Sequence, residues 1–570
     1  MPHRRQTIGR RLLAATFMCG RLPRVAVAVL LCVAIFQVFL IHLWHRFHQS
    51  RDLMGELPRL QSAFAVPRAG GYYTMTTATA TCERLVSTYD EDNTLAKLFL
   101  LARQAGIVVP CHDSALRGLN FSVCSKKCII AANLHNSMEV IPNMIVQLIW
   151  TAHLLGPANI LVSIYESGSK DATADWLQLL RAVLGYLSVP HIITTGGITR
   201  EPGQDRIAYL ASVRQAAVDQ VLANCNKYAT NFCNSSRIVY VNDVLFNAPS
   251  MVRLLQYGNE DMACGMDFEP ILADHPMSEQ RSYMTGHLLQ TWHLPRPLAS
   301  SLASSTLAFR LWKKAYRRSA TLLRLLPLSF YDIWVARDVA GDRFTRPAPF
   351  THHGPTAARI QAGLPVSAYC CWNGLIALAA QPLLSRRIAF RAHRPPPHRN
   401  GPADDGGGVA DRAHNSGGDN ECAASECSLL CDDFHRLGRS RIVIDPSVRV
   451  AYRAVAAERI FLGSSSTSIS SALSSSSSSG GGGDDPRVTA EPADLLPHVE
   501  WSPWLISDLE AWRVEQGLPS TVECCGLEPG RDGVDFEHGC VRIPSLAGTV
   551  VSVVASRNGG NGSGSDGDRK

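Results

Sequence analysis

Strand-like and helix-like segments alternate along residues 128–241, and this order limits the folds that the chain can adopt. The β-branched runs lie at 128–132, 159–165, 191–195 and 237–241, and the helical patterns between them lie at 138–155, 171–187 and 206–222. This βαβαβαβ order predicts an α/β fold with a Rossmann-type, mostly parallel sheet and helices on both faces. Ligands of such sheets bind outside the carboxyl ends of the strands. We therefore expect the functional residues along one edge of the sheet.

The residues that follow these strands are expected to meet at that edge: Asn133, Glu166, Gly196 and Asp243. The pair Asn242-Asp243 is the most informative, because it ends a buried strand and the chain then turns at 247–249. A carboxylate in this place can hold Mn²⁺ or Mg²⁺, which prefer oxygen ligands and often take some of them from phosphate groups. The alternative interpretation of Asp243 is a turn residue without a ligand.

Two further patterns have both a functional and a structural interpretation. Glu166 ends a strand, small residues then form a tight turn, and Asp171 or Thr173 can cap the next helix. This pattern fits either a nucleotide-contacting loop or a capped strand-to-helix turn without a ligand. Arg206 and Arg214 lie eight residues apart on one face of a predicted helix. Arginines there can bind phosphate oxygens in a bidentate way. They can equally belong to a solvated charged face.

Eight short motifs occur in an order similar to that of a known family. They lie at 132–136, 163–169, 206–214, 241–244, 264–268, 330–341, 371–374 and 425–427. Together they resemble the fungal capsule-associated α-1,3-mannosyltransferase family, glycosyltransferase family 69, over residues 82–460. The resemblance implies a GT-A-like domain that transfers mannose from GDP-mannose to a mannose-containing glycan acceptor, in α-1,3 linkage and with retention of configuration. It also implies a divalent cation, with Mn²⁺ favoured over Mg²⁺.

The same resemblance implies roles for individual residues. The expected donor site consists of Asn133, Glu166, Arg206, Arg214, Asn242 and Asp243, with Asp243 also as metal ligand. The expected acceptor side consists of Asp267, Arg337, Trp372 and Asn373, where the indole of Trp372 can stack on a sugar. The catalytic candidates are Glu426, Asp332 and Asp338, and His435 is a candidate second metal ligand.

Glu426 lies at the start of a predicted helix whose cap is Ser425 or a residue just before it. A retaining transferase can use a carboxylate on the lower face of the sugar, and Glu426 or Asp432 is placed to serve. The alternative is that a glutamate in the first helical turn only interacts favourably with the helix dipole.

Two other functions stay open on the sequence alone. One keeps the fold and changes the donor sugar, for example to xylose from UDP-xylose. The other is a catalytically inactive scaffold in polysaccharide or capsule assembly. Neither changes the predicted fold.

The N-terminus predicts a membrane anchor. Residues 1–24 are basic, and residues 25–44 form an apolar run close to the ~20 residues that cross a bilayer. The basic flank predicts a cytosolic N-terminus and a lumenal catalytic domain, hence a single-pass type II protein, which the resemblance places in the Golgi membrane. A cleaved signal peptide is the alternative, although its apolar region would be shorter.

Composition divides the rest of the chain. Residues 45–81 form a predicted stem, residues 82–462 the globular transferase domain, and residues 463–570 a low-complexity tail without an assigned role. The domain is expected to carry insertions at 272–328 and 394–420. The second of these, rich in Pro, Gly and Asp, has too little apolar surface for a packed core.

The cysteines and the charge are consistent with a lumenal enzyme. Seventeen cysteines favour an oxidising compartment, and without a zinc-type spacing they are expected to form disulfides or buried thiols. Asn120 and Asn234 begin N-glycosylation motifs, as does Asn561. The net charge is +6, with much of the excess at the N-terminus, which argues against a nucleic-acid-binding body.

Overall fold

A computed structural model describes residues 55–62, 93–224, 232–270, 328–392, 421–422, 425–461, 496–525 and 540–547 of the 570-residue chain. The predicted anchor at 25–44, the insertion at 394–420 and all but the last residue of the insertion at 272–328 lie outside the described residues. Residues 55–62 form a short helix in a unit of their own. The second unit contains the sheet and every predicted site residue.

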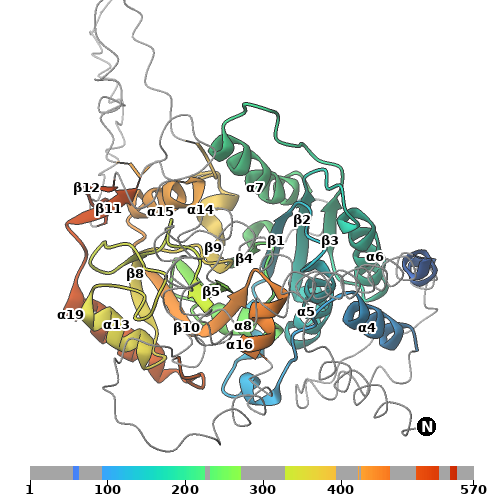
Figure 1. Ribbon diagram of the computed structural model, residues 1–570, viewed down its shortest axis with the longest axis horizontal. Coiled ribbons are helices and arrows are strands. Elements are labelled where there is room, and N and C mark those ends of the chain that lie inside the picture. The colour runs from blue at the N-terminus through green and yellow to red at the C-terminus, as the bar shows by residue number, and fades with distance from the viewer. Residues whose placement is uncertain are drawn as a thin grey trace, which may run out of the picture. The chain divides into compact units, whose positions relative to one another are not determined.

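One sheet of ten strands organises this unit (Figure 1). Its strands are β1 (Cys128–Leu134), β2 (Ile160–Glu166), β3 (His191–Thr194), β4 (Arg237–Val241), β5 (Met262–Pro270), β6 (Leu328–Phe330), β7 (Arg337–Asp338), β8 (Val366–Cys370), β9 (Leu375–Ala379) and β10 (Ile442–Ala451). The order is β3-β2-β1-β4-β9-β5-β10-β8-β7, and β6 pairs with β5 off this path. The sequence predicted β1 to β4, and their parallel pairing confirms that prediction.

The other half of the sheet is mixed. β9 runs antiparallel between β4 and β5, whereas β10 is parallel to β5. β8 and β7 extend the sheet beyond β10 in antiparallel pairs, and β6 pairs antiparallel with the end of β5. The fold is therefore an α/β fold with a mixed, mostly parallel sheet.

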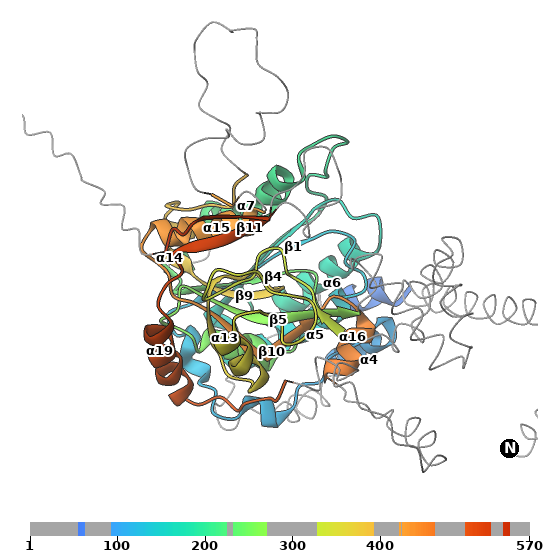
Figure 2. The same ribbon diagram turned by 60° about the vertical axis from the view of Figure 1, so that its left-hand side comes forward.

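Helices cover both faces of the sheet, as the sequence predicted (Figures 1 and 2). One face carries α7 (Arg206–Ala223), α14 (Ala380–Leu384) and α15 (Glu426–Arg436), and the other carries α5 (Ile141–Leu155), α8 (Ala248–Leu255) and α16 (Ala454–Phe461). α4 (Asn93–Ala105) and α6 (Thr173–Tyr186) pack against α5. Because both faces are covered, the central strands are buried along nearly their whole length.

Disulfides link elements that are distant in the sequence. They join Cys124 to Cys128, Cys264 to Cys371, Cys370 to Cys431, Cys422 to Cys524 and Cys525 to Cys540. Among the described cysteines only Cys427 is free, and it is buried. The disulfide interpretation is thus confirmed. The bonds to Cys371 and Cys431 connect the 371–374 turn and α15 to the sheet.

Part of the predicted C-terminal tail belongs to the domain. Residues 496–525 include α19 (Trp504–Gln516), which packs against β8, and β11 (Thr521–Cys525), which pairs with β12 (Cys540–Pro544). Trp501 packs edge-on against Tyr257 with ring centroids 4.9 Å apart. The sequence prediction ended the domain at residue 462, because a low-complexity run follows it. The packing of residues 496–525 was therefore missed.

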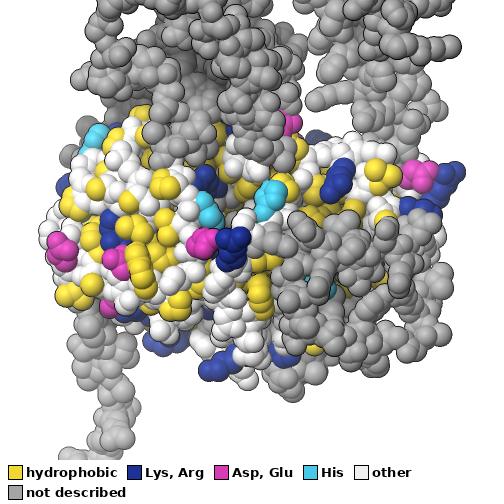
Figure 3. Space-filling model, turned by 90° about the horizontal axis from the view of Figure 1, so that it is seen from below, with side chains coloured by type: hydrophobic (Ala, Val, Ile, Leu, Met, Phe, Trp, Pro, Cys, Tyr) yellow, Lys and Arg dark blue, Asp and Glu magenta, His cyan; other side chains and the backbone are white. Residues whose placement is uncertain are grey.

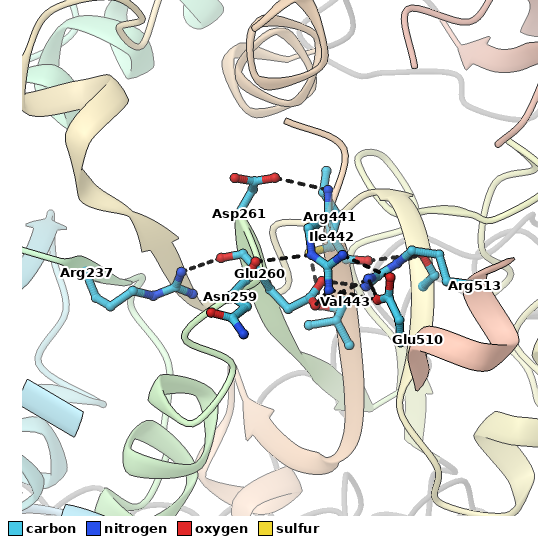
Figure 4. A network of polar contacts seen from close by, with 11 residues as sticks. Arg237, Asn259, Glu260, Asp261, Arg441, Ile442, Val443, Glu510 and Arg513 are labelled. Carbon is cyan, nitrogen blue, oxygen red and sulfur yellow. Dashed lines mark hydrogen bonds and ion pairs between the residues drawn. The ribbon is translucent and has the colours of Figure 1, made fainter. Parts of the chain in front are cut away.

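A partly buried ion-pair network attaches α19 to the amino ends of β5 and β10 (Figure 4). Arg513 donates to Glu260 Oε2 at 2.5 Å, and Arg441 lies 3.1 Å from Glu260 Oε1. Glu510 accepts from both arginines, at 2.6 Å from Arg513 and 2.7 Å from Arg441. Since Glu260 is only 2% exposed, its charge depends on these two guanidinium groups.

Replacing Arg513 with lysine is expected to lower the free energy of unfolding by about 1–2 kcal/mol, because an ammonium cannot reproduce the fork of hydrogen bonds to Glu260 and Glu510. Urea denaturation of the folded domain measures this change. The matched control is Arg386→Lys, since Arg386 forms an exposed pair with Asp219 at 3.6 Å and is expected to lose no more than about 0.5 kcal/mol. Equal losses in the two variants would contradict the prediction.

The described surface has no single type of side chain that dominates it. On the face shown in Figure 3, acidic, basic and apolar side chains are interspersed. Within the described ranges, no helix is both long and apolar enough to span a bilayer. Asn120 and Asn234, the predicted glycosylation acceptors, are both exposed.

Candidate functional site

The carboxyl ends of β1, β2, β3 and β4 meet at one edge of the sheet, as the sequence predicted. The strand register places Ala132 beside Val241 and Asn133 beside Tyr165. Asn133 and Asn242 therefore stand at the same level on neighbouring strands, which lie roughly 4.8 Å apart. β1 has β2 on one side and β4 on the other, so the winding of the sheet reverses here. Ligands of open α/β sheets bind at such a reversal.

Glu166 and Asn133 hold the loops of this edge in place. Glu166 is buried, and its carboxylate accepts from the Ser169 N–H and, at 2.7 Å, from the Gly196 N–H. Asn133 Nδ2 donates to Ser167 Oγ at 2.7 Å. These bonds favour the structural interpretation of both side chains. A nucleotide contact for Glu166 stays a prediction.

Asn242 and Asp243 follow β4 directly and lean on the 371–374 turn. The Asn242 N–H donates to the Gly374 carbonyl at 2.9 Å, and Asn242 Oδ1 accepts from Trp372 Nε1 at 3.3 Å. Gly374 has φ 74°, and a Cβ there would lie 2.9 Å from the Val244 side chain. Glycine is therefore required at this turn, which keeps Asn242 fixed at the end of β4.

Asp243 lies at the carboxyl end of β4, within electrostatic reach of two arginines. Its side chain is exposed, yet desolvation by the surrounding protein raises its pKa above the ordinary value. The positive charges of Arg214 and Arg453 oppose this rise. Because the side chain is exposed, a ligand can reach the carboxylate. A bound cation would favour the charged carboxylate.

The side chain of Arg214 is half-buried, with 14% of its surface exposed, and it is already paired. Its guanidinium lies 2.8 Å from Glu426 Oε1 and donates to Cys427 Sγ. It also stacks over the Trp372 indole, 4.9 Å from the ring centroid. Burial alone would lower its pKa, but Cys427 and Glu426 outweigh burial and the pKa is raised. Arg214 thus remains a cation at the wall of the site.

Asp267 and Asp332 form a buried acid pair, and Arg214 acts electrostatically on Asp332. The Asp332 N–H donates to Asp267 Oδ1 at 3.1 Å, and Asp267 Oδ2 has no hydrogen-bond partner among the described residues. Burial first, and then the neighbouring Asp332, raise the pKa of Asp267 well above its usual range. Burial raises the pKa of Asp332 to about 6, against the opposing charges of Arg214 and Arg337. A carboxyl group with this pKa can exchange a proton near neutral pH.

The Asp332→Asn variant is expected to flatten the pH dependence of stability. Because the pKa of Asp332 is about 6 in the folded state and ordinarily 3.8, its ionisation weakens the fold as pH rises from about 4 to 6. Above pH 6 the cost is on the order of 2–3 kcal/mol. Asparagine mimics the protonated acid, so the variant should match the wild type near pH 4 and exceed it near pH 7. Urea denaturation across pH 4–8 measures the difference, and a gain that shrinks with pH would contradict it.

Three predicted site residues are engaged elsewhere. Arg206 begins α7 and is exposed, about two helical turns before the half-buried Arg214. Asp338 is fully buried and accepts from Thr351 Oγ1 and from backbone N–H groups in its own turn. Arg337 is 2% exposed and donates to main-chain carbonyls, including that of Glu523 at 2.5 Å. These contacts contradict a direct substrate contact for Asp338 and Arg337 in this conformation.

Trp372 and Asn373 are buried next to the site and support the residues at its surface. Trp372 is 2% exposed and is enclosed by Arg214, Tyr240 and Phe390, so its indole faces are not free to stack on a sugar. Asn373 is fully buried and donates to the Gly265 carbonyl at 2.8 Å. The predicted acceptor stacking is therefore wrong for this conformation. The sequence indicated the turn but not its burial.

His435 does not fit a metal site. It is 1% exposed, lies 2.8 Å from the Tyr369 carbonyl through Nε2 and stacks on the Tyr369 ring. Burial lowers its pKa to about 4, so the ring is neutral. These contacts contradict the predicted role beside Asp243. Its helix neighbour Asp432 accepts from the Tyr369 hydroxyl at 2.9 Å and is buried as well.

A cation fits Asp243 with few protein ligands. The carboxylate is accessible and the neighbouring Asn242 offers an amide oxygen, which are hard donors of the kind that Mn²⁺ and Mg²⁺ take. The remaining ligands have to come from a phosphate or water. In the described part of the chain, one cluster of Glu523, Cys525 and Cys540 has ligand spacing, but its cysteines form a disulfide and cannot bind a metal.

Tyr452 is a site residue that the sequence did not reveal. It directly follows β10, and its hydroxyl lies next to Gly374, where an added Cβ would be 3.6 Å from it. Its ring packs on Tyr331 with centroids 4.2 Å apart. The available signal was a tyrosine at the carboxyl end of a buried parallel strand, the same signal that indicated Asp243.

Residues 127–433 match the family model described as Cryptococcal mannosyltransferase 1. The match covers more than half of the chain. The chain belongs to this cryptococcal mannosyltransferase family. The prediction made from the eight ordered motifs is confirmed.

One curated relative and one solved structure extend the comparison. Alpha-1,3-mannosyltransferase CMT1 of Cryptococcus neoformans var. neoformans serotype D is 24% identical over 353 residues, which are 58% of this chain and 59% of that protein. The chain thus spans about three fifths of the length of its curated cryptococcal mannosyltransferase relative. The structure of mannosyltransferase PcManGT from Pyrobaculum calidifontis, in complex with GDP-Man and Mn²⁺, aligns over 65% of this chain and 67% of that chain, with 10% identity and a TM-score of 0.25. That likeness is too low to carry an argument.

Proposed function

We propose that the chain transfers mannose from GDP-mannose to a mannose-containing glycan acceptor, with a divalent cation, Mn²⁺ in preference to Mg²⁺. The observation that carries this proposal is Asp243. It is an accessible carboxylate at the carboxyl end of β4, where the sheet winding reverses, in a chain of the cryptococcal mannosyltransferase family. Asp243 would hold the cation there, and the cation would supply positive charge to the leaving diphosphate.

The side chains around Asp243 have distinct tasks in this reaction. Asn242 fixes the direction of the strand end, and the Arg214 cation adds positive potential beside the diphosphate. The bond between mannosyl C1 and the β-phosphate oxygen breaks, a bond between C1 and an acceptor hydroxyl oxygen forms, and the acceptor proton leaves with the diphosphate or with water. The Asp267–Asp332 pair lies nearby and can take up or release a proton near neutral pH.

The finer features belong to the proposal as well. We infer a GT-A-like domain, an α-1,3 linkage and retention of configuration from the ordered motifs. Glu426 is the catalytic candidate best supported by its position: it is 2% exposed, is paired with Arg214 through Oε1, and its Oε2 has no hydrogen-bond partner among the described residues. Ser425 caps its helix, as expected, by accepting from the Ser428 N–H at 3.1 Å.

The proposed cellular place is the Golgi membrane. Residues 25–44 would anchor the chain with the catalytic domain in the lumen, where disulfides form and the exposed Asn120 and Asn234 can be glycosylated. Expression of residues 45–570 behind a cleavable signal should then release a glycosylated protein into the medium, whereas the full chain should stay in membranes. Recovery of the full chain in the soluble fraction would contradict the anchor.

A donor panel tests the activity directly. The secreted lumenal chain is incubated with GDP-mannose, UDP-xylose or UDP-glucose, with mannosides as acceptors, in Mn²⁺, Mg²⁺ or EDTA. Transfer from GDP-mannose that EDTA stops and Mn²⁺ restores is the expected result. Transfer from UDP-xylose alone would contradict GDP-mannose as the donor and would identify UDP-xylose instead. Absence of both transfer and calorimetric binding of GDP with Mn²⁺ would support a scaffold instead.

A further inference from the structure

Tyr452 stands where the two halves of the candidate site meet. Its backbone N–H donates to the Phe268 carbonyl at 3.3 Å, which ties it to β5 just after Asp267. Its ring packs against Tyr331, the residue before Asp332. Its hydroxyl lies beside Gly374, whose carbonyl accepts from the Asn242 N–H. Tyr452 thus joins the strand end of Asp243 to the buried acid pair.

The hydroxyl of Tyr452 is available to a ligand. The side chain is half-buried, and no hydrogen bond to its oxygen occurs among the described residues. By contrast, the hydroxyls of Tyr257 and Tyr369 are satisfied by Asp445 and Asp432, at 2.8 and 2.9 Å. The half-buried Tyr452 hydroxyl therefore differs from these two in having its hydrogen-bonding capacity unused by the described residues.

Charge around Tyr452 decides which form the phenol takes. Burial, followed by the charges of Asp267, Asp332 and Asp243, raises its pKa well above the ordinary value. The hydroxyl therefore stays protonated and acts as a hydrogen-bond donor.

We propose that Tyr452 is a donor-substrate residue whose hydroxyl donates a hydrogen bond to an oxygen of the sugar diphosphate held at Asp243. This inference rests on the proposed function. The bond would strengthen as negative charge gathers on the leaving diphosphate, so it would act mainly on the rate and less on ground-state binding.

The Tyr452→Phe variant tests this role. Phenylalanine keeps the ring contact with Tyr331 and removes only the hydroxyl, so the melting temperature should stay close to that of the wild type. The expected result is a fall in kcat of about 100-fold with little change in the KM for the acceptor. Hydrolysis of GDP-mannose without acceptor should fall by a similar factor, because the lost bond lies on the donor side.

Tyr257→Phe is the matched control. It also loses one phenolic hydroxyl, but that hydroxyl bonds to Asp445 within the core. This variant should lose stability and keep its kcat at temperatures where it is folded. A variant that loses kcat but not stability points to a role in the site, and a variant that loses stability but not kcat points to a role in packing.

Other outcomes overturn the inference in distinguishable ways. An unchanged kcat for Tyr452→Phe in an active wild-type background refutes the role of Tyr452 and leaves the proposed function intact. A rise in acceptor KM with normal donor hydrolysis moves the residue to the acceptor side and refutes it too. A wild-type protein that neither hydrolyses nor transfers mannose from GDP-mannose refutes the proposed function, and this inference with it.

Discussion

Replacing Asp243 with asparagine is expected to lower kcat/KM for GDP-mannose by at least about 100- to 1000-fold. The amide keeps the shape of the side chain and removes the negative charge that would hold the cation against the diphosphate. Since the Asp243 side chain is exposed and asparagine has nearly the same shape, the neutral variant should fold about as well as the wild type. The loss of activity therefore cannot be attributed to unfolding.

Three measurements check this expectation. Initial rates of mannose transfer with increasing Mn²⁺ should show no recovery in the variant, and calorimetry should show weaker binding of GDP with Mn²⁺. Thermal melts should confirm the fold. Asp219→Asn is the matched control, because Asp219 is an acidic residue of α7 that bonds to Gln215 at 2.9 Å and is expected to be neutral for activity. Full Mn²⁺-dependent transfer by the Asp243→Asn variant would contradict the assignment of Asp243 as the metal ligand.

Replacing Arg214 with glutamine is expected to cost about 3–5 kcal/mol of folding free energy together with most of the activity. The side chain of Glu426 is 2% exposed and has Arg214 as its ion-pair partner at 2.8 Å, so the single change leaves a buried charge without compensation. Urea denaturation measures the stability loss. Activity alone would not tell whether Arg214 acts on the diphosphate or only supports Glu426.

The double variant Arg214→Gln with Glu426→Gln separates these two roles. It removes both charges, so the stability should return to within about 1–2 kcal/mol of the wild type. If the Arg214 cation supports the leaving diphosphate, transfer should remain reduced by about 100-fold or more. Recovery of activity along with stability would show that the pair is only structural and that neither residue takes part in the reaction.

The sheet edge that carries Asn133, Glu166 and Asp243 was largely predictable from the sequence, because it depends on local patterns. The alternation of strands and helices predicted β1 to β4 with end points that differ by at most two residues from the observed ones. Parallel strands deliver their carboxyl ends to one edge, so the positions of Asn133, Glu166 and Asp243 followed from that alternation alone.

For the buried acidic residues of the site, the sequence predicted which residues take part. It did not predict which of them contact one another. Asp267, Asp332 and Glu426 were all named from motifs, but nothing local indicates that Asp332 packs on Asp267 or that Glu426 pairs with Arg214. His435 and Trp372 failed as predicted ligand contacts because their burial depends on β8 and on the residues that enclose them. A motif preserves residue order and says little about exposure.

The sequence by itself determined the α/β class, the family and the strand-end position of Asp243, since each follows from a pattern read along neighbouring residues. Only the tertiary structure decided that Arg214 meets Glu426 and Cys427, that Tyr452 closes the gap between Asp243 and the acid pair, and that residues 496–525 belong to the domain. The physical reason is separation along the chain: Arg214 and Cys427 are 213 residues apart. Contacts over such distances are set by how helices pack on a sheet, and no local periodicity encodes that packing.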